Sequence, residues 1–180
     1  MKIGITGGIG SGKSYVCKRL QRHGIAVYDC DAAAKRLIRT SPDLQQQIIR
    51  LVGSLDKAAM SQFLLASEAN FQAMNAIIHP VVFHDFEQSG IDWMESAILF
   101  ESGARRLVDK TIVVTAPEEV RIQRIIERDG ITREKALQWI ARQWPQQKVK
   151  SLSDFEIVND GETDIDSQIE KILNNLETSK

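Results

Sequence analysis

The sequence predicts an α/β fold built around a parallel β-sheet. Residues 2–28 read as a short apolar strand, a glycine-rich turn, a helix and a second apolar strand. A later run at 111–115, Thr-Ile-Val-Val-Thr, has the β-branched composition of another buried strand. Other stretches carry apolar residues at helical spacing. Because parallel neighbours need a crossover connection, which is usually a helix, this alternation indicates parallel strands.

Composition limits the classes of protein to consider. The chain has 180 residues, a formal net charge of −1 and a pI of about 6.3, so we expect one domain that binds neither nucleic acid nor an anionic membrane. No apolar run is long enough to span a membrane. Cys17 and Cys30 lie in different elements without the spacing of metal ligands, which suggests a reduced compartment and a cytoplasmic protein.

The first strand leads into the motif G-x-x-x-x-G-K-[ST], which is satisfied by Gly7, Gly12, Lys13 and Ser14. Glycines let consecutive backbone N–H groups turn towards one anion, aided by the positive end of the following helix. Lys13 would contact the β- and γ-phosphates of a nucleoside triphosphate, and the Ser14 hydroxyl would ligate the bridging Mg²⁺. A glycine-rich turn with a solvated lysine is the alternative, but few chance matches lie between a strand and a helix. The residues expected to contact the triphosphate are Gly8, Ile9, Gly10, Ser11, Gly12, Lys13, Ser14 and Tyr15.

The second strand is expected at 25–28, after Gly24 has ended the first helix. Asp31 follows this strand and lies near the start of a helix at 32–38, so helix capping is the simplest role for it. A functional role follows from position, because ligands of open α/β sheets bind at the carboxyl ends of the strands. There the Asp31 carboxylate could take a proton from an attacking hydroxyl or help to hold Mg²⁺.

Residues 42–89 contain apolar sets at helical spacing and no convincing strand, which predicts a helical insertion. Pro42 is expected to begin its first helix, and His79-Pro80 is expected to interrupt and kink its last one. Because function collects on the connections above a rigid sheet, this insertion is expected to carry the second substrate. His79 taken alone reads as a packed or solvated histidine.

The remaining strands are expected at 91–96, 111–115 and 155–158. The first of these is followed by an apolar exit that ends at Glu101, and Pro117 is expected at the first position of the helix after the second. A turn at 159–161 and an amphipathic helix from Ile165 would close the chain.

The segment 121–150 is basic, with eight Lys or Arg against three Asp or Glu. Arg121, Arg124 and Arg128 have i, i+3, i+7 spacing, which puts them on one face of a helix. After a turn at Asp129-Gly130, a second helix is expected from Thr132. A solvated charged face is the simpler interpretation, but two exposed basic helices joined by a tight turn are also what a phosphate-clamping lid would look like.

Together these segments resemble the dephospho-coenzyme A kinase family. The resemblance begins with the order of glycines in residues 6–14 and with Asp29-Cys30-Asp31. Later motifs follow in the family's order: His79-Pro80, Leu99-Phe100-Glu101, Arg124 with Arg128-Asp129-Gly130, Gln143 with Pro145 and Lys148, and Asp154 with Ile157, Asn159 and Gly161. The resemblance implies one three-layer P-loop kinase domain over 1–180, with five parallel strands in the order 2-3-1-4-5. Its core would be 1–31, 91–119 and 151–180, its helical substrate domain 32–90 and its lid 120–150.

The same resemblance implies ATP and Mg²⁺ as cofactors and dephospho-CoA as the small-molecule substrate. Phosphorylation of the ribose 3′-hydroxyl would complete coenzyme A synthesis. The catalytic residues would be Asp31 as the base, Lys13 and Arg128. Asn159 would lie on the adenine side, whereas His79, Glu101 and Arg124 would lie on the substrate side. Ser14 would hold the magnesium, with Asp29 or Asp31 as a further ligand, and we expect a monomer or a weak oligomer.

The chain departs from the family's usual pattern at three positions and in one short loop at 53–55. Tyr15 replaces a Thr, Ala97 replaces a Pro and Lys57 replaces an Arg, and none of these removes a residue with a proposed chemical role. Another small-acceptor kinase, acting on a nucleoside monophosphate or a hydroxy acid, is the nearest alternative. A P-loop switch or mechanical ATPase fits less well, because the sequence has no Asn-Lys-x-Asp segment and no convincing Asp-Glu pair at the end of a strand.

Overall fold

The computed structural model describes residues 1–178 and contains a five-stranded sheet with the strand order β2-β3-β1-β4-β5. Its strands are β1 (Ile3–Thr6), β2 (Val27–Asp29), β3 (Trp93–Glu95), β4 (Lys110–Thr115) and β5 (Phe155–Val158). β1 pairs in parallel with both β3 and β4, and β4 pairs in parallel with β5. The expected α/β class and strand order are confirmed.

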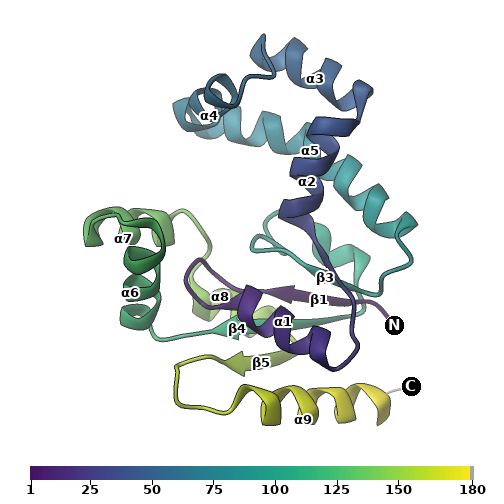
Figure 1. The fold of residues 1–180 in the computed structure, drawn as a ribbon, viewed down its shortest axis with the longest axis vertical. Helices are drawn as coiled ribbons and strands as arrows, with labels where there is room; N and C mark the ends of the chain where they lie inside the picture. The colour runs from purple at the N-terminus through teal and green to yellow at the C-terminus, as the bar shows by residue number, and fades with distance from the viewer. Residues whose placement is uncertain (179–180) are drawn as a thin grey trace. The chain divides into compact units, whose positions relative to one another are not determined.

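Contacts divide the chain into two compact units, Met1–Val27 with Asp92–Lys180 and Tyr28–Ile91. The helices of the first unit are α1 (Lys13–Arg22), a 3-10 helix (Ala104–Leu107), α6 (Glu118–Asp129), α7 (Arg133–Ala141), α8 (Gln146–Leu152) and α9 (Ile165–Thr178). Those of the second unit are α2 (Cys30–Thr40), α3 (Pro42–Val52), α4 (Lys57–Ala66) and α5 (Glu68–Gln88), and Figure 1 labels the α-helices of both units.

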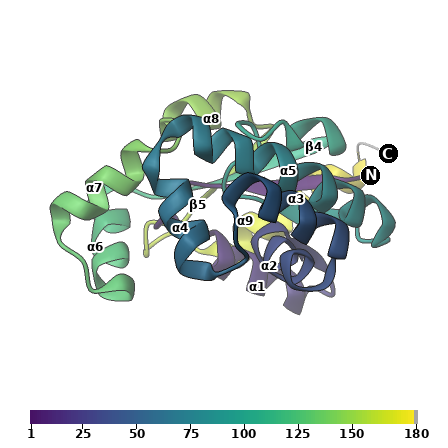
Figure 2. The same ribbon diagram turned by 90° about the horizontal axis from the view of Figure 1, so that it is seen from above.

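Helices cover both faces of the sheet in the first unit. Ile3, Ile5 and Val114 point to one face, where they pack against the buried sides of α1 and α9. α8 contacts β4 from the other face (Figure 2). Gly4 alternates with its neighbours and faces that second side, where a Cβ would come within 2.8 Å of Leu99. The core therefore lies in layers above and below the strands.

Strand register sets what stands next to the exit of β1. Ile5 lies opposite Glu95 in β3 and opposite Ile112 in β4. Because β1 and β3 run in the same direction, the last residue of β3 lies beside the segment that leaves β1 at Gly7. The carboxyl edge of the sheet, where open α/β proteins bind ligands, thus brings Glu95 next to the glycine-rich loop.

α5 runs from Glu68 to Gln88 as one helix with Pro80 inside it, so the expected interruption at His79-Pro80 is wrong. Proline removes one backbone hydrogen bond and would break an isolated helix. Contacts of α5 with α2, α3 and α4 hold the helix together instead.

Three polar side chains fix the start of α2 to α5. The Tyr28 hydroxyl donates a hydrogen bond to Oδ2 of Asp85 at 2.6 Å, and Nη2 of Arg36 donates to the same oxygen at 2.5 Å. Partial burial works to raise the pKa of Asp85, but the hydrogen bonds from Tyr28 and Arg36 outweigh it and lower the pKa. Because Tyr28 and Arg36 flank Asp31 in the sequence, the turn that carries Asp31 is anchored on both sides.

The residue that caps α2 is Asp29, not Asp31. The Asp29 carboxylate accepts a hydrogen bond from the backbone N–H of Ala32 at 2.9 Å. Asp31 lies two residues further along the chain and is exposed in the first turn of α2. The helix begins at Cys30, two residues earlier than expected, and this earlier start places the cap at Asp29. Asp31 is therefore not needed as a cap.

Other local expectations also need correction. Pro117 caps α6 instead of beginning it, because its ψ of 144° is extended. The strand expected at 91–96 would bury Trp93, but this residue is half-buried at the edge of the core. α8 was not expected, since it has seven residues and only Val149 is buried.

The structure also describes the helices and the two cysteines on which the expectations from composition depend. Within residues 1–178 no helix combines the length and the apolar content needed to cross a bilayer. Cys17 and Cys30 are both buried, one in each unit.

Candidate active site

The loop Gly7–Gly12 connects β1 to α1. Gly10 and Gly12 have φ angles of 79° and 83°, in the left-handed region that favours glycine. The Ser11 N–H donates to the Gly8 carbonyl at 3.0 Å, and the Tyr15 N–H donates to the Gly12 carbonyl at 2.9 Å. A closed glycine loop of this kind, followed directly by the positive end of a helix, is suited to binding phosphate.

A side chain at Gly12 has no room, which gives a test of the loop. A Cβ there would overlap Nδ2 of Asn159, and the backbone φ of 83° would be strained. We expect Gly12→Ala to lose affinity for ADP by about ten-fold or more in isothermal titration calorimetry.

Gly24→Ala is the matched control for this loop variant. Gly24 has a similar φ of 77°, but among the described residues a Cβ there would meet nothing within 4 Å. It should lower thermal stability and leave the affinity for ADP in place. Equal losses of ADP affinity in the two variants would show that general backbone strain, not the loop, controls binding.

Two side chains outside the loop hold Ile9 in place. Nε of Arg121 in α6 donates to the Ile9 carbonyl at 2.9 Å, and Oε1 of Gln143 accepts from the Ile9 N–H at 2.7 Å. Only 5% of Arg121 is exposed, and burial lowers the pKa of its guanidinium. Because arginine stays protonated in proteins even so, the loop has a buried positive charge against it.

Arg124 and Asn159 hold the second half of the loop. Nη1 of Arg124 donates to the Asn159 carbonyl at 2.9 Å and to the Gly10 carbonyl at 3.4 Å. Nδ2 of Asn159, which follows β5, donates to the Ser11 carbonyl at 2.9 Å. Donors from outside thus occupy carbonyl oxygens of the loop that would otherwise repel a phosphate.

Lys13 forms an ion pair with Glu95, and each side chain is 11% exposed. Lys13 begins α1 and Glu95 ends β3, so the pair joins the loop to the neighbouring strand. No local pattern in the sequence singles out Glu95, because one glutamate ends this strand and not an Asp-Glu pair.

The residues at this edge fit a magnesium ion held mainly by a nucleotide. Mg²⁺ usually takes one or two protein oxygens and completes its shell with phosphates and water. The exposed Ser14 hydroxyl follows Lys13 directly, and the Glu95 carboxylate is paired with Lys13. Among the described residues no group of three or more His, Cys, Asp or Glu is arranged to hold a metal by itself.

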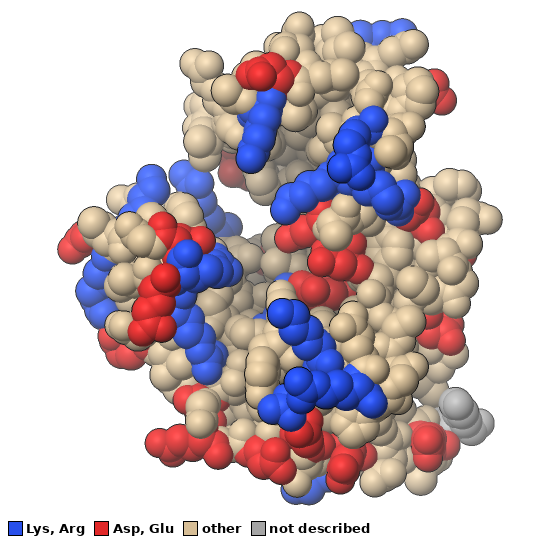
Figure 3. All heavy atoms as spheres, viewed as in Figure 1, with Lys and Arg blue, Asp and Glu red and all other residues tan. Residues whose placement is uncertain are grey.

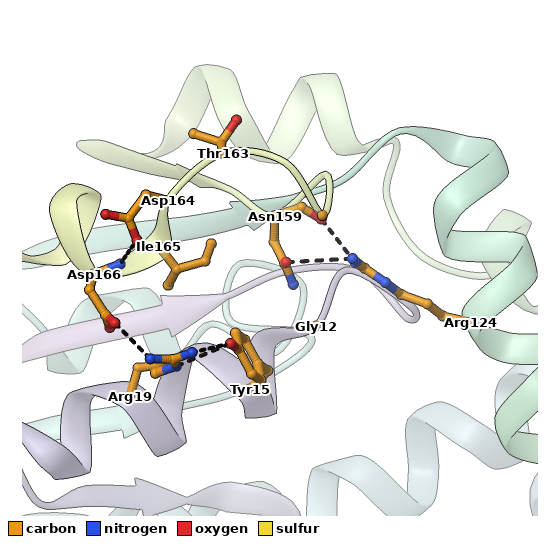
Figure 4. Close-up of a pocket in the computed structure, with 10 residues that line it drawn as sticks. Gly12, Tyr15, Arg19, Arg124, Asn159, Thr163, Asp164, Ile165 and Asp166 are labelled. Carbon is orange, nitrogen blue, oxygen red and sulfur yellow. Dashed lines mark hydrogen bonds and ion pairs between the residues drawn. The ribbon is translucent and has the colours of Figure 1, made fainter.

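A pocket of about 500 Å³ opens beside the loop (Figure 4). It is lined by Gly12, Tyr15, Arg19, Arg124, Asn159, Gly161, Thr163, Asp164, Ile165 and Asp166. One wall comes from α1 and the other from the segment between β5 and α9. A cavity with these polar walls next to a phosphate-binding loop has the size and the position for a nucleoside.

The pocket wall between β5 and α9 is held by two carboxylates. Asp160 accepts hydrogen bonds from the N–H groups of Thr163 at 2.8 Å and Glu162 at 3.0 Å, and these bonds lower the pKa of its carboxyl to about 2. Asp164 accepts from the N–H of Asp166 at 3.1 Å and from that of Ser167 at 3.3 Å. This wall therefore has a defined shape at neutral pH.

A family model described as Dephospho-CoA kinase matches residues 1–164. The chain belongs to the dephospho-CoA kinase family. A dephospho-CoA kinase of Bacteroides fragilis is 37% identical to it, over 96% of this chain and 91% of that protein. One of Chlorobaculum tepidum is 34% identical, over 98% of this chain and 95% of that protein.

Solved structures share the fold of this chain. A crystal structure of a Thermus thermophilus protein matches with a TM-score of 0.84 and 29% identity, over 97% of this chain and 96% of that one. A shikimate kinase from Acinetobacter baumannii, solved with shikimate, shares the fold at a TM-score of 0.63 and 16% identity, over 99% of this chain and 94% of that one.

The other residues that resemble dephospho-CoA kinase motifs each contact a different part of the protein. Arg124, expected on the substrate side, contacts the phosphate loop, whereas the Arg128 guanidinium donates to the carboxylate of its neighbour Asp129 at 2.7 Å. Oε1 of Glu101 accepts a hydrogen bond from the Trp144 N–H at 3.2 Å. His79, in the second unit, stacks on Phe83 at 5.6 Å between ring centroids, and burial lowers the pKa of its imidazole.

Proposed function

We propose that this chain transfers the γ-phosphoryl group of ATP to the ribose 3′-hydroxyl of dephospho-CoA through the loop at 7–12, Lys13 and Asp31. The observation that carries this assignment is the loop itself, whose Ile9, Gly10 and Ser11 carbonyls are bound by outside donors while Lys13 is held at its mouth by Glu95. Phosphoryl transfer needs little covalent work from a protein, so positioning and charge neutralisation supply most of the catalysis.

The donor side is formed by the first unit. The N–H groups of residues 8–15 other than those of Ile9, Ser11 and Tyr15, which are bonded within the protein, would face the phosphates, and the pocket beside Asn159 would take the base and ribose. Lys13 would exchange its ion pair with Glu95 for the β- and γ-phosphates. When bound, Mg²⁺ would neutralise charge on the same phosphates, with the Ser14 hydroxyl as its protein ligand and Asp29 or Asp31 as a further candidate.

Asp31 is proposed as the base that takes the proton of the 3′-hydroxyl. Because Asp29 caps α2, the exposed Asp31 carboxylate does not cap this helix. Its turn is anchored through Asp85, which keeps the position of a base constant. Acceptor contacts are proposed for the helical unit near His79 and for Glu101.

The α6–α7 hairpin is proposed as a lid that closes over the phosphates. Arg133 of α7 donates two hydrogen bonds to Glu119 of α6, at 2.7 and 2.5 Å, so the two helices are linked and could move together. Basic and acidic side chains are interleaved on this part of the surface (Figure 3). Arg128 would exchange the carboxylate of Asp129 for phosphate charge on closure.

Tryptophan emission should report lid closure. Trp139 packs half-buried against the α6–α7 core, and Trp144 is exposed with Nζ of Lys148 3.3 Å from its ring centroid. A non-hydrolysable ATP analogue added with dephospho-CoA should shift emission more than either ligand alone. Trp139→Phe combined with Trp144→Phe should remove that extra shift, whereas Trp93→Phe should keep it. If the extra shift survives the double replacement, the hairpin is not the lid.

The substrate is tested by ADP release with ATP, Mg²⁺ and a panel of acceptors. The panel consists of dephospho-CoA, adenosine, AMP, CMP and shikimate. Turnover should depend on dephospho-CoA. Turnover with AMP, CMP or shikimate and none with dephospho-CoA would instead favour another small-acceptor kinase. A cytoplasmic location and a monomeric or weakly oligomeric state stay predictions from the sequence.

A further inference from the structure

Tyr15 is an aromatic residue with no packing role to explain it. It lies in the first turn of α1 directly after Ser14, and 46% of it is exposed. It lines the pocket beside the phosphate loop and is the one aromatic residue among the ten that do so. The helix buries Val16, Cys17 and Leu20 instead, so the ring of Tyr15 faces the pocket without helping to build the core.

Two charged residues fix this ring in place. Nε and Nη2 of Arg19 donate to the Tyr15 hydroxyl at 3.1 and 2.5 Å, and the guanidinium carbon lies 5.0 Å from the ring centroid. Nη1 of Arg19 donates to Oδ2 of Asp166 at 2.6 Å, which ties the arrangement to the first turn of α9 (Figure 4). The Tyr15 ring is thus held by Arg19 of the same helix, and Arg19 is in turn held by Asp166 of α9.

We propose that Tyr15 is the stacking platform for the nucleobase, and that Arg19 and Asp166 are positioning residues that set the angle of its ring. The proposal rests on the donor side described under the proposed function, which puts the base in this pocket. A base stacks on a flat ring, and Tyr15 supplies the one ring in a lining that otherwise consists of polar residues, two glycines and Ile165.

A purely structural role for the same residues predicts something different. If Arg19 served only to link α1 to α9 through Asp166, its loss would lower thermal stability and would not affect how a base is held. If the ring has the proposed role, loss of Tyr15 must weaken binding of a nucleotide more than binding of the same phosphates without a base. The ratio of the affinity for ATP to the affinity for inorganic triphosphate therefore distinguishes the two roles.

The test uses the full chain and the fluorescent triphosphate of 2-aminopurine riboside, whose emission is quenched when the base stacks. We expect the wild-type chain to quench the probe, and Tyr15→Phe to quench it less, because Phe keeps a ring but loses the two hydrogen bonds from Arg19. We expect Tyr15→Thr to lose the quenching. In competition, Tyr15→Thr should lower the affinity for ATP relative to inorganic triphosphate by about ten-fold, the effect expected for one base on one aromatic ring.

Arg19→Met and Asp166→Asn test the positioning residues. Each should reduce the quenching and lower the ratio of ATP to triphosphate affinity less than Tyr15→Thr does. A lower melting temperature with an unchanged ratio would overturn their role, and an unchanged ratio in Tyr15→Thr would overturn the platform. If the wild-type chain bound neither ATP nor triphosphate, the proposed function itself would fail, which is a different result.

Discussion

Replacement of Asp31 by Asn is expected to lower kcat for phosphoryl transfer by about two to four decades, the range associated with loss of a general base. The amide keeps the shape of the side chain but cannot accept the proton of the 3′-hydroxyl. ATP binding should persist, because the donor contacts come from the loop and the pocket of the other unit. Single-turnover transfer and ATP titration on the same preparation separate the two quantities.

Asp29→Asn is the matched control for this variant. Asparagine is as good a helix cap as aspartate, so the start of α2 should keep its structure. Its kcat should fall less than that of Asp31→Asn. Losses of ATP affinity and turnover by the same factor in Asp31→Asn would identify Asp31 as a magnesium ligand and not as the base.

Lys13→Met is expected to abolish measurable turnover, because it removes the charge that neutralises the transferring phosphates. From sequence alone one would expect almost no effect on folding, since Lys13 would lie on an exposed loop. The structure corrects that expectation: Lys13 is 11% exposed and paired with a Glu95 that is equally covered. Removing one partner of a buried ion pair costs about 3–5 kcal/mol, because the remaining charge is left uncompensated.

The double variant Lys13→Met with Glu95→Gln separates these two effects. It should recover most of the stability lost in the single variant, as measured by urea unfolding, and recover no turnover. Unchanged stability in Lys13→Met would show that the ion pair contributes nothing to the fold. Turnover within a few-fold of the wild-type value would remove the case for the phosphate loop.

Local patterns in the sequence predicted the parts of the site that depend on a few neighbouring residues. The glycine loop, β4 and β5 were found because strand composition, glycine spacing and helix caps are short-range signals. Glu95 was missed, since its importance comes from the register of β3 against β1. The contacts of Arg121 and Gln143 with Ile9 join residues 112 and 134 positions apart, and no local pattern encodes them.

The error at Pro80 has the same origin. A proline inside a helical pattern signals a break when the helix is considered by itself. In α5 the packing of three other helices outweighs the lost hydrogen bond. The error at Asp31 was one of boundaries: the two aspartates are two residues apart, which is within the usual uncertainty of a helix start. The observed cap at Asp29 supports the proposal that Asp31 is the base, because helix capping no longer explains an aspartate at position 31.

The most direct test of the proposed reaction is the position of the transferred phosphate. The chain is incubated with ATP, Mg²⁺ and dephospho-CoA, and the product is then cleaved at its pyrophosphate and its nucleotide half identified. The account predicts adenosine 3′,5′-bisphosphate in equal amount to the ADP released. ADP without this product, a 2′-phosphate, or a second phosphate on the pantetheine half would contradict it.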